Sequence, residues 1–365
     1  MQLNRNAYII VTDLHWTSKN LSGRYNYQRE IEYAREKIVE TVLKYKSFCS
    51  KTVLVFLGDL YHNSYSDIVP GIVDNNRMIQ LRMLVDDIVS VVGNHEFSYY
   101  SDNPFWTLFT KLESNKIKTK INKTWQPRGV VDIIRVVDEL IDGDVRFIFN
   151  HYGCGIERPP IDGKLNIGLI HQDLYSKAIV EDLKASKGVP IYEYNPIYFD
   201  QSSVLYGYDR CYLGHAHMLY GKWKYVCNQT NYTTYIEYLS TLGRTNHLEV
   251  QDNFLERNIP VIIVENGKFV RQEDNFFNLL SREECVNEKV IQTSKNKREE
   301  YKETKELRQT RLQLRDDPIE NLRENLKGYP PLLAVLDDLV ESGDTRFSKS
   351  ILTEFEELIS NHDYK

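Results

Sequence analysis

Five short clusters of polar residues each follow an apolar stretch that predicts a β-strand. Their side chains are carboxylates, imidazoles and one carboxamide, without any thiolate. In chain order the clusters are Asp13-Leu14-His15, Gly58-Asp59, Gly93-Asn94-His95, His171 and Gly214-His215-Ala216-His217. Nitrogen and oxygen ligands of this kind suit Mn, Fe, Zn or Co. Two aspartates, one asparagine and four histidines supply enough ligands for two ions. A shared aspartate can bridge such ions about 3.5–4 Å apart, as in two-metal hydrolytic sites.

The elements that must position these clusters alternate between strands and helices. Short apolar or β-branched runs predict strands at residues 7–11, 52–57, 88–92, 145–149, 165–170 and 210–213. Apolar residues recur at helical spacing over residues 29–45 and 75–84. This alternation implies parallel strands with helices outside them. The second half of the chain predicts more antiparallel pairing, with a Glu265-Asn266-Gly267 hairpin turn.

The composition is typical of a globular protein, and we expect an intracellular, reducing environment. Hydrophobic residues make up 41% of the 365 residues and charged residues 27%. The net charge of −6 does not favour coating nucleic acid by bulk charge. The five cysteines form no CxxC pair, which argues against a disulfide framework and a zinc-thiolate site. Because no apolar run reaches the length of a membrane span or a signal peptide, we expect a cytoplasmic protein.

A change in composition near residue 280 predicts three regions. Residues 1–280 contain all five clusters and form the expected catalytic domain. Residues 281–316 are dense in charge and predict a helical linker or a reduced cap. Residues 317–365 regain apolar residues at helical spacing. Because so short a segment buries little surface alone, we expect it to dock on the main domain or a partner.

The five clusters, in this order, resemble the DxH, GDxx, GNHD/E, H and GHxH motifs of the calcineurin-like metallophosphoesterase superfamily. The resemblance covers residues 7–275 and implies an α/β (α+β) fold, a four-layer β-sandwich flanked by helices, here with a C-terminal helical extension. Three segments further resemble the nuclease subunit of the double-strand-break repair complex, called SbcD in bacteria and also encoded by phages. These segments are Gly58–His62, Ile167–Gln172 and Leu239–Thr245.

The resemblance implies seven metal ligands and two further active-site histidines. The first ion would be bound by Asp13, His15 and His217, and the second by Asn94, His171 and His215. Asp59 would bridge the two ions. His95 would lie near the leaving group, as a general acid or a stabiliser of the transition state. His62 occupies the position of the second active-site histidine. His151 also ends an apolar strand and is an alternative ligand, but Gly168-Leu169-Ile170-His171-Gln172 favours His171.

The resemblance implies a metal-dependent phosphodiesterase that cuts DNA as an exo- or endonuclease. Two divalent ions are expected, Mn²⁺ first, with Mg²⁺, Zn²⁺ or Fe as alternatives. Expected partners are DNA, a second copy in a homodimer, and an SbcC-like ABC-type ATPase at the terminal helices; a phage-encoded chain would act in the host cytoplasm. Two departures are Glu96 in place of the usual aspartate and the lack of a distinct DNA-binding cap segment.

Two alternatives stay open at this point. The same superfamily includes enzymes that act on a small phosphodiester, such as a cyclic nucleotide, or on a phosphoprotein, and the acidic charge favours that reading. The chain can also be a partner-dependent scaffold whose metals serve structure.

Overall fold

The structure is a computed structural model of the chain. It describes residues 4–17, 21, 26–62, 71–96, 110–120, 133–181, 196–217, 219–227, 230–245, 249–250 and 255–286, with a few positions beyond them. The chain divides into two compact units, Met1–Glu288 and Lys289–Lys365, and only the first is described at length. In the second unit the structure describes the short helix η3 (Leu326–Gly328). The helices expected over residues 317–365 otherwise lie outside the described residues.

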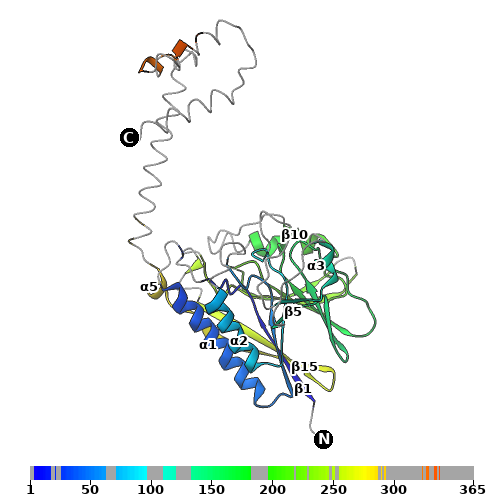
Figure 1. The fold of residues 1–365 in the computed structure, drawn as a ribbon. Helices are drawn as coiled ribbons and strands as arrows, with labels where there is room; N and C mark the ends of the chain where they lie inside the picture. Colours follow the sequence, from blue (N-terminus) through cyan, green and yellow to red (C-terminus); the bar gives the residue numbers. More distant parts are fainter. Residues whose placement is uncertain are drawn as a thin grey trace. The chain divides into compact units, whose positions relative to one another are not determined.

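Two large mixed sheets form the first unit (Figure 1). The first sheet has, in spatial order, β15 (Lys268–Asn278), β14 (Glu256–Glu265), β1 (Arg5–Val11), β2 (Lys51–Phe56), β3 (Asp87–Ser90), β5 (Ile134–Val136) and β4 (Thr110–Leu112). The second has β12 (Gly221–Val226), β13 (Thr233–Tyr238), β11 (Arg210–Leu213), β8 (Leu165–Ile170), β7 (Val145–Asn150) and β6 (Glu139–Asp142). A small third sheet pairs β9 (Leu174–Tyr175) with β10 (Ile197–Tyr198). The predicted α/β class with a two-sheet sandwich is confirmed.

The alternation of apolar residues along β1 shows how the layers stack. Ala7 and Ile9 pack in a core with the helix α1 (Tyr27–Lys46), which lies beside α2 (Gly71–Leu84) (Figure 1). Tyr8 faces the other way, into a core shared with the second sheet. A third core covers the far side of the second sheet and includes the short helix η1 (Phe199–Gln201). The layers therefore stack in the order helices, first sheet, second sheet and outer layer.

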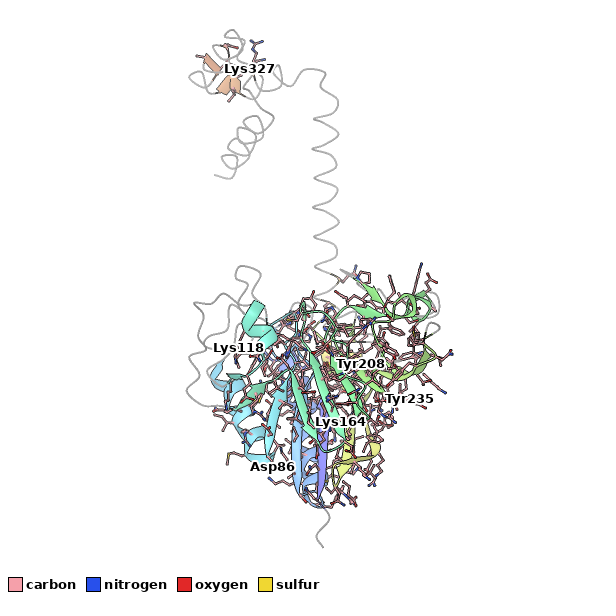
Figure 2. The ribbon with its side chains drawn as sticks, turned by 90° about the vertical axis from the view of Figure 1, so that its right-hand side faces the viewer. Asp86, Lys118, Lys164, Tyr208, Tyr235 and Lys327 are labelled. Atoms are coloured by element: carbon pink, nitrogen blue, oxygen red, sulfur yellow. The ribbon has the colours of Figure 1, made fainter. Side chains whose placement is uncertain are left out.

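Two tyrosines labelled in Figure 2, Tyr208 and Tyr235, differ in exposure. Tyr208 in the outer layer is buried, and its hydroxyl receives a hydrogen bond from Asn150 at 3.0 Å. Tyr235 of β13 is 49% exposed. The end of β7, where Asn150 lies, is thus tied to the outer layer by a buried polar contact.

The direction of strand pairing places the predicted clusters together. β1, β2 and β3 are parallel neighbours, and so are β7, β8, β11 and β13. The expectation of more antiparallel pairing in the second half is confirmed for β12–β13, β14–β15 and β1–β14, whereas β11 pairs in parallel with both β8 and β13. The β14–β15 hairpin is antiparallel as predicted, and both Asn266 and Gly267 have the positive φ of a type I′ turn. It joins the first sheet beside β1.

Two short helices complete the described part of the first unit. α3 (Asn115–Lys120) follows β4 in the chain, and α5 (Arg282–Cys285) begins at a capping box formed by Ser281 and Glu284. Arg282 donates a hydrogen bond to the Val250 carbonyl at 2.7 Å, which ties α5 to this unit beyond the predicted boundary at residue 280. None of the described helices combines the length and apolar character needed to cross a bilayer.

Candidate metal centre

The loops after β1, β2, β3, β8 and β11 converge at the carboxyl ends of these strands. The backbone N–H of Asp13 donates to the Gly58 carbonyl at 3.2 Å, and that of His15 donates to the Asp59 carbonyl at 2.9 Å. Asp13, His15, Asp59 and His215 all adopt positive φ, between 47° and 75°. Such backbone conformations are costly for residues with a Cβ and concentrate at functional sites. The strain identifies this loop cluster as a site held in place by the surrounding fold.

Two ligand groups share Asp59 in this cluster. We call Asp13, His15, His217 and Asp59 site 1, and Asn94, His171, His215 and Asp59 site 2. In site 1, His15 Nε2 lies 2.9 Å from His217 Nε2 and 3.9 Å from Asp59 Oδ2. In site 2, Asn94 Oδ1 lies 3.1 Å from His171 Nε2 and 2.8 Å from His215 Nδ1. Donor atoms that bind one ion at about 2.1 Å lie about 3 to 4 Å apart, so both sites have the dimensions of a metal polyhedron.

The donor set itself fits divalent cations. Asp13 Oδ1 and Asp59 Oδ2 are buried carboxylate oxygens that have no hydrogen-bond partner in the part of the chain that the structure describes. A buried anionic oxygen without a donor is costly unless a cation neutralises it. Asp59 Oδ2 lies 3.3 Å from His171 Nε2 in site 2 as well as near His15 in site 1. The two unsatisfied oxygens therefore mark where positive charge belongs.

The electrostatics of the two sites keep the carboxylates ionised. Burial raises the pKa of Asp59, but the neighbouring His171 and His95 outweigh burial and hold that pKa well below its usual range. Burial lowers the pKa of His171, whereas Asp59 and Asp13 raise it, to about 9. Burial lowers the pKa of His15 far below its usual value, so this imidazole stays neutral.

Glu96 supports the loop that carries Asp59. Its carboxylate accepts hydrogen bonds from the backbone N–H groups of Asp59 at 3.0 Å, Leu60 at 2.8 Å and Gly93 at 2.6 Å. A Cβ atom at residue 93 would collide with Asp59 and Glu96, so only glycine leaves room there. Burial and the adjacent Asp59 carboxylate raise the pKa of Glu96 to about 7. The residue that departs from the family's usual aspartate thus supports the loop and belongs to neither site.

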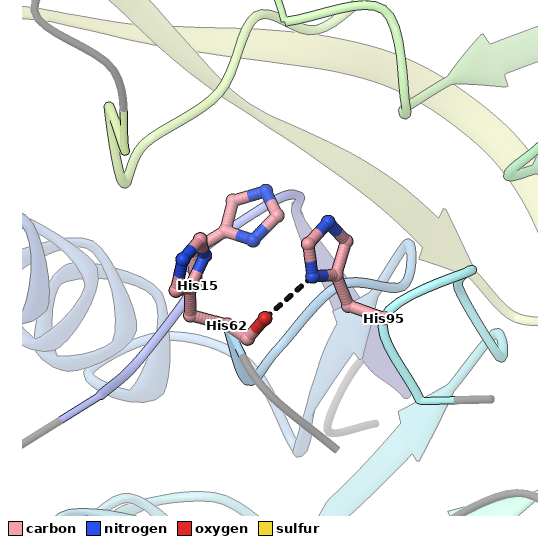
Figure 3. A group of neighbouring side chains, drawn as sticks. All are labelled: His15, His62 and His95. Atoms are coloured by element: carbon pink, nitrogen blue, oxygen red, sulfur yellow. Dashed lines mark hydrogen bonds between the residues drawn. The ribbon is translucent and has the colours of Figure 1, made fainter. Parts of the chain in front are cut away.

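His62 and His95 lie beside site 1 (Figure 3). Their rings are stacked with centroids 5.4 Å apart, and His95 is 4.7 Å from the ring of His15. The Nδ1 of His95 is hydrogen-bonded to the backbone carbonyl of His62. Because a carbonyl only accepts, the proton is on Nδ1, and Nε2 is left facing the cluster, 4.0 Å from Asp59 Oδ2. Burial and the adjacent His95 lower the pKa of His62 to about 4.

His151 lies outside both sites. It follows β7 directly, but its Nδ1 accepts a hydrogen bond from the Val92 N–H at 3.1 Å. Its Nε2 faces Asp138 at 3.5 Å. Both ring nitrogens are thus directed to partners away from the cluster, whereas His171 is directed into it.

Residues 239–245 lie beside site 1 and contact the loop after β1. The Asp13 carbonyl accepts the backbone N–H of Gly243 at 2.9 Å. Arg244 is fully buried and donates to the Glu30 carboxylate of α1 at 2.9 Å. The features that resemble the nuclease subunit in this segment therefore hold the loop after β1 in place.

Two carboxylates of the centre were not among the predicted residues. Asp173 Oδ1 lies 2.9 Å from His215 Nε2, and Glu249 Oε1 lies 3.0 Å from His217 Nδ1. Asp173 follows His171 by two residues, which is a local signal. Glu249 has no local signal in the sequence, because it precedes β14 and meets His217 only through the fold.

Two ligand groups that share one aspartate are typical of two-metal hydrolytic sites. The family model "Calcineurin-like phosphoesterase" matches residues 8–219, more than half of the chain. The chain belongs to this family, whose members are metal-dependent hydrolases.

Solved structures also match at low identity. A 5′-nucleotidase precursor from Thermus thermophilus is 12% identical, with a TM-score of 0.38, over 79% of this chain and 58% of that one. The NAD nucleotidase of Haemophilus influenzae is 10% identical, with a TM-score of 0.35, over 81% of this chain and 56% of that one. The chain thus spans less than two thirds of the length of either protein. The search of curated proteins finds no match.

Proposed function

We propose that the protein hydrolyses phosphodiester bonds of DNA with two divalent metal ions. The observation that supports this most is the position of Asp59, whose Oδ2 lies 3.9 Å from His15 Nε2 and 3.3 Å from His171 Nε2. Two divalent ions, when bound, lower the pKa of water and neutralise charge on the phosphate. We propose Asp13, His15 and His217 as further ligands of site 1.

We propose Asn94, His171 and His215 as further ligands of site 2, and Mn²⁺ as the metal at both sites. Mn²⁺ accepts mixed imidazole, carboxylate and carboxamide ligands. Mg²⁺, Zn²⁺ and Fe are the alternatives for a metal-replacement assay. The donor set with no thiolate supports this choice.

His95 is proposed as the residue that assists the leaving group. With its Nδ1 proton held by the His62 carbonyl, His95 offers Nε2 toward the reacting phosphate. A protonated Nε2 donates to the departing ester oxygen or stabilises negative charge in the transition state. His62 is proposed to fix the ring of His95 through that carbonyl and through ring stacking at 5.4 Å.

DNA as substrate and an SbcC-like ABC-type ATPase as partner are supported by the resemblance of three segments to the nuclease subunit. The same resemblance supports a homodimer and binding of the ATPase by residues 317–365. Pull-down of the full chain with an SbcC-like ATPase encoded beside it tests the partner directly. No co-purification at micromolar concentrations would contradict it.

The variants Asp59→Ala and His95→Asn test the mechanism. With Mn²⁺, wild-type protein is expected to cleave bis(p-nitrophenyl) phosphate and single-stranded DNA. His95→Asn is expected to bind metal as wild type does but to lose about 100- to 10,000-fold in kcat. Full activity of either variant would refute the mechanism.

A second candidate substrate is a small phosphoester, such as a cyclic nucleotide, a 5′-nucleotide or a phosphopeptide. The net charge of −6 favours it, because an acidic protein repels a polyanion. Assays of these compounds beside single-stranded DNA, at equal Mn²⁺ and salt, decide between the two. If wild-type protein gains thermal stability from metal but hydrolyses none of them, a scaffold with structural metals is the better account.

A further inference from the structure

The two histidines of the GHAH motif face different sites through different ring nitrogens. His215 has Nδ1 in site 2, 2.8 Å from Asn94 Oδ1. His217 has Nε2 in site 1, 3.5 Å from Asp13 Oδ1. A single residue separates the two histidines, and His215 alone of the pair has a positive φ.

A carboxylate lies against the opposite nitrogen of each ring. Asp173 Oδ1 is 2.9 Å from His215 Nε2, and Glu249 Oε1 is 3.0 Å from His217 Nδ1. An ionised carboxylate only accepts hydrogen bonds, so the proton of His215 is on Nε2 and that of His217 is on Nδ1. When a ring carries only that proton, the lone pair of its other nitrogen points into its own site. Asp173 is 4% exposed and Glu249 is also largely shielded, which strengthens both hydrogen bonds.

We propose that Asp173 and Glu249 are positioning residues, each of which selects the ligating nitrogen of one histidine and so controls the metal affinity of one site. Asp173 acts on site 2 through His215. Glu249 acts on site 1 through His217. This inference rests on the proposed two-metal centre. Outer carboxylates that orient ligand histidines typically contribute 10- to 100-fold to metal affinity.

The test measures Mn²⁺ binding to the full chain after removal of metal with a chelator. Isothermal titration of wild type is expected to show two Mn²⁺ sites. Asp173→Ala is expected to weaken one of them by about 10- to 100-fold, and Glu249→Ala to weaken the other. Asp173→Asn and Glu249→Gln keep an acceptor oxygen and are expected to lose less than the alanine variants.

The protonated nitrogen of each histidine ring gives a second measurement, which a purely structural role of the carboxylates would not change. Nitrogen-15 spectra of the histidine rings, recorded with Zn²⁺, are expected to show His215 protonated at Nε2 and His217 at Nδ1 in wild type. Each alanine variant is expected to change the pattern of its own histidine only. Asp138→Asn is the matched control, because Asp138 faces His151, 3.5 Å away and outside both sites.

The outcomes separate this inference from the proposed function. If wild type binds two Mn²⁺ ions and both alanine variants bind them as wild type does, the inference is overturned. Equal weakening of both sites by every variant, including Asp138→Asn, indicates a general structural effect and also overturns it. If wild type itself binds no pair of ions, the proposed metal centre fails, and the inference fails with it.

Discussion

Site 1 and site 2 share Asp59 but are held by different means. Beside site 1, backbone contacts dominate: Gly243 N–H donates to the Asp13 carbonyl, in a segment anchored by the Arg244–Glu30 pair. Around site 2, one side chain does the same work: Glu96 accepts the N–H groups of Asp59 and Leu60 in the loop after β2 and of Gly93 in the loop after β3. The difference teaches that one cluster can be held by a remote segment at one end and by a single carboxylate that joins two loops at the other.

The largest effect is expected where the two sites meet. Asp59→Ala removes the oxygen that faces both sites, so we expect loss of both Mn²⁺ ions and at least about a 1,000-fold loss of phosphodiester hydrolysis. Isothermal titration and a bis(p-nitrophenyl) phosphate assay measure the two losses. A variant that still binds one ion at wild-type affinity would show that the sites are independent.

Arg244→Met tests the long-range support of site 1. It removes the guanidinium that binds the buried Glu30 carboxylate, and we expect a loss of about 3–5 kcal/mol in the free energy of unfolding. Urea denaturation measures this loss. The double variant Glu30→Met/Arg244→Met is the control, and it should be less destabilised than Arg244→Met alone. Equal stability of Arg244→Met and wild type would contradict the role of the Arg244–Glu30 pair as an anchor.

His171 and His151 form a matched pair, since each follows one of two adjacent parallel strands. His171→Ala is expected to lose the site 2 ion and about 100-fold in hydrolysis. His151→Ala is expected to bind both ions but to melt at a lower temperature, because the buried Val92 N–H loses its acceptor. Loss of one ion in His151→Ala would indicate that His151, and not His171, is the ligand of site 2.

Glu96→Gln gives the smallest expected effect. Glutamine offers one acceptor oxygen and turns an NH₂ group toward backbone donors, which costs about 1–3 kcal/mol. Thermal unfolding without metal should show this loss. Weaker Mn²⁺ binding should accompany it, because the bridging loop loses its support. Unchanged stability would mean that water replaces the carboxylate.

Much of the fold followed from local patterns. The apolar runs predicted strands at β1, β2, β7, β8 and β11, because side-chain periodicity is set within a few residues. The order of the strands within each sheet was not predicted, since strand neighbours depend on crossovers and on which faces are buried together. The helices expected near the C-terminus lie outside the described residues.

By itself, the sequence determined the chemistry of the donor set: carboxylates, imidazoles and a carboxamide at strand ends, in the order of the calcineurin-like phosphoesterase family. Only the tertiary structure decided that His171 faces the centre and His151 does not. It alone brought Glu249 to His217, and Thr241 to the carbonyl of Asp13. The physical reason is that residue type is a local property, whereas the direction of a side chain and its distant partner depend on how sheets and loops pack.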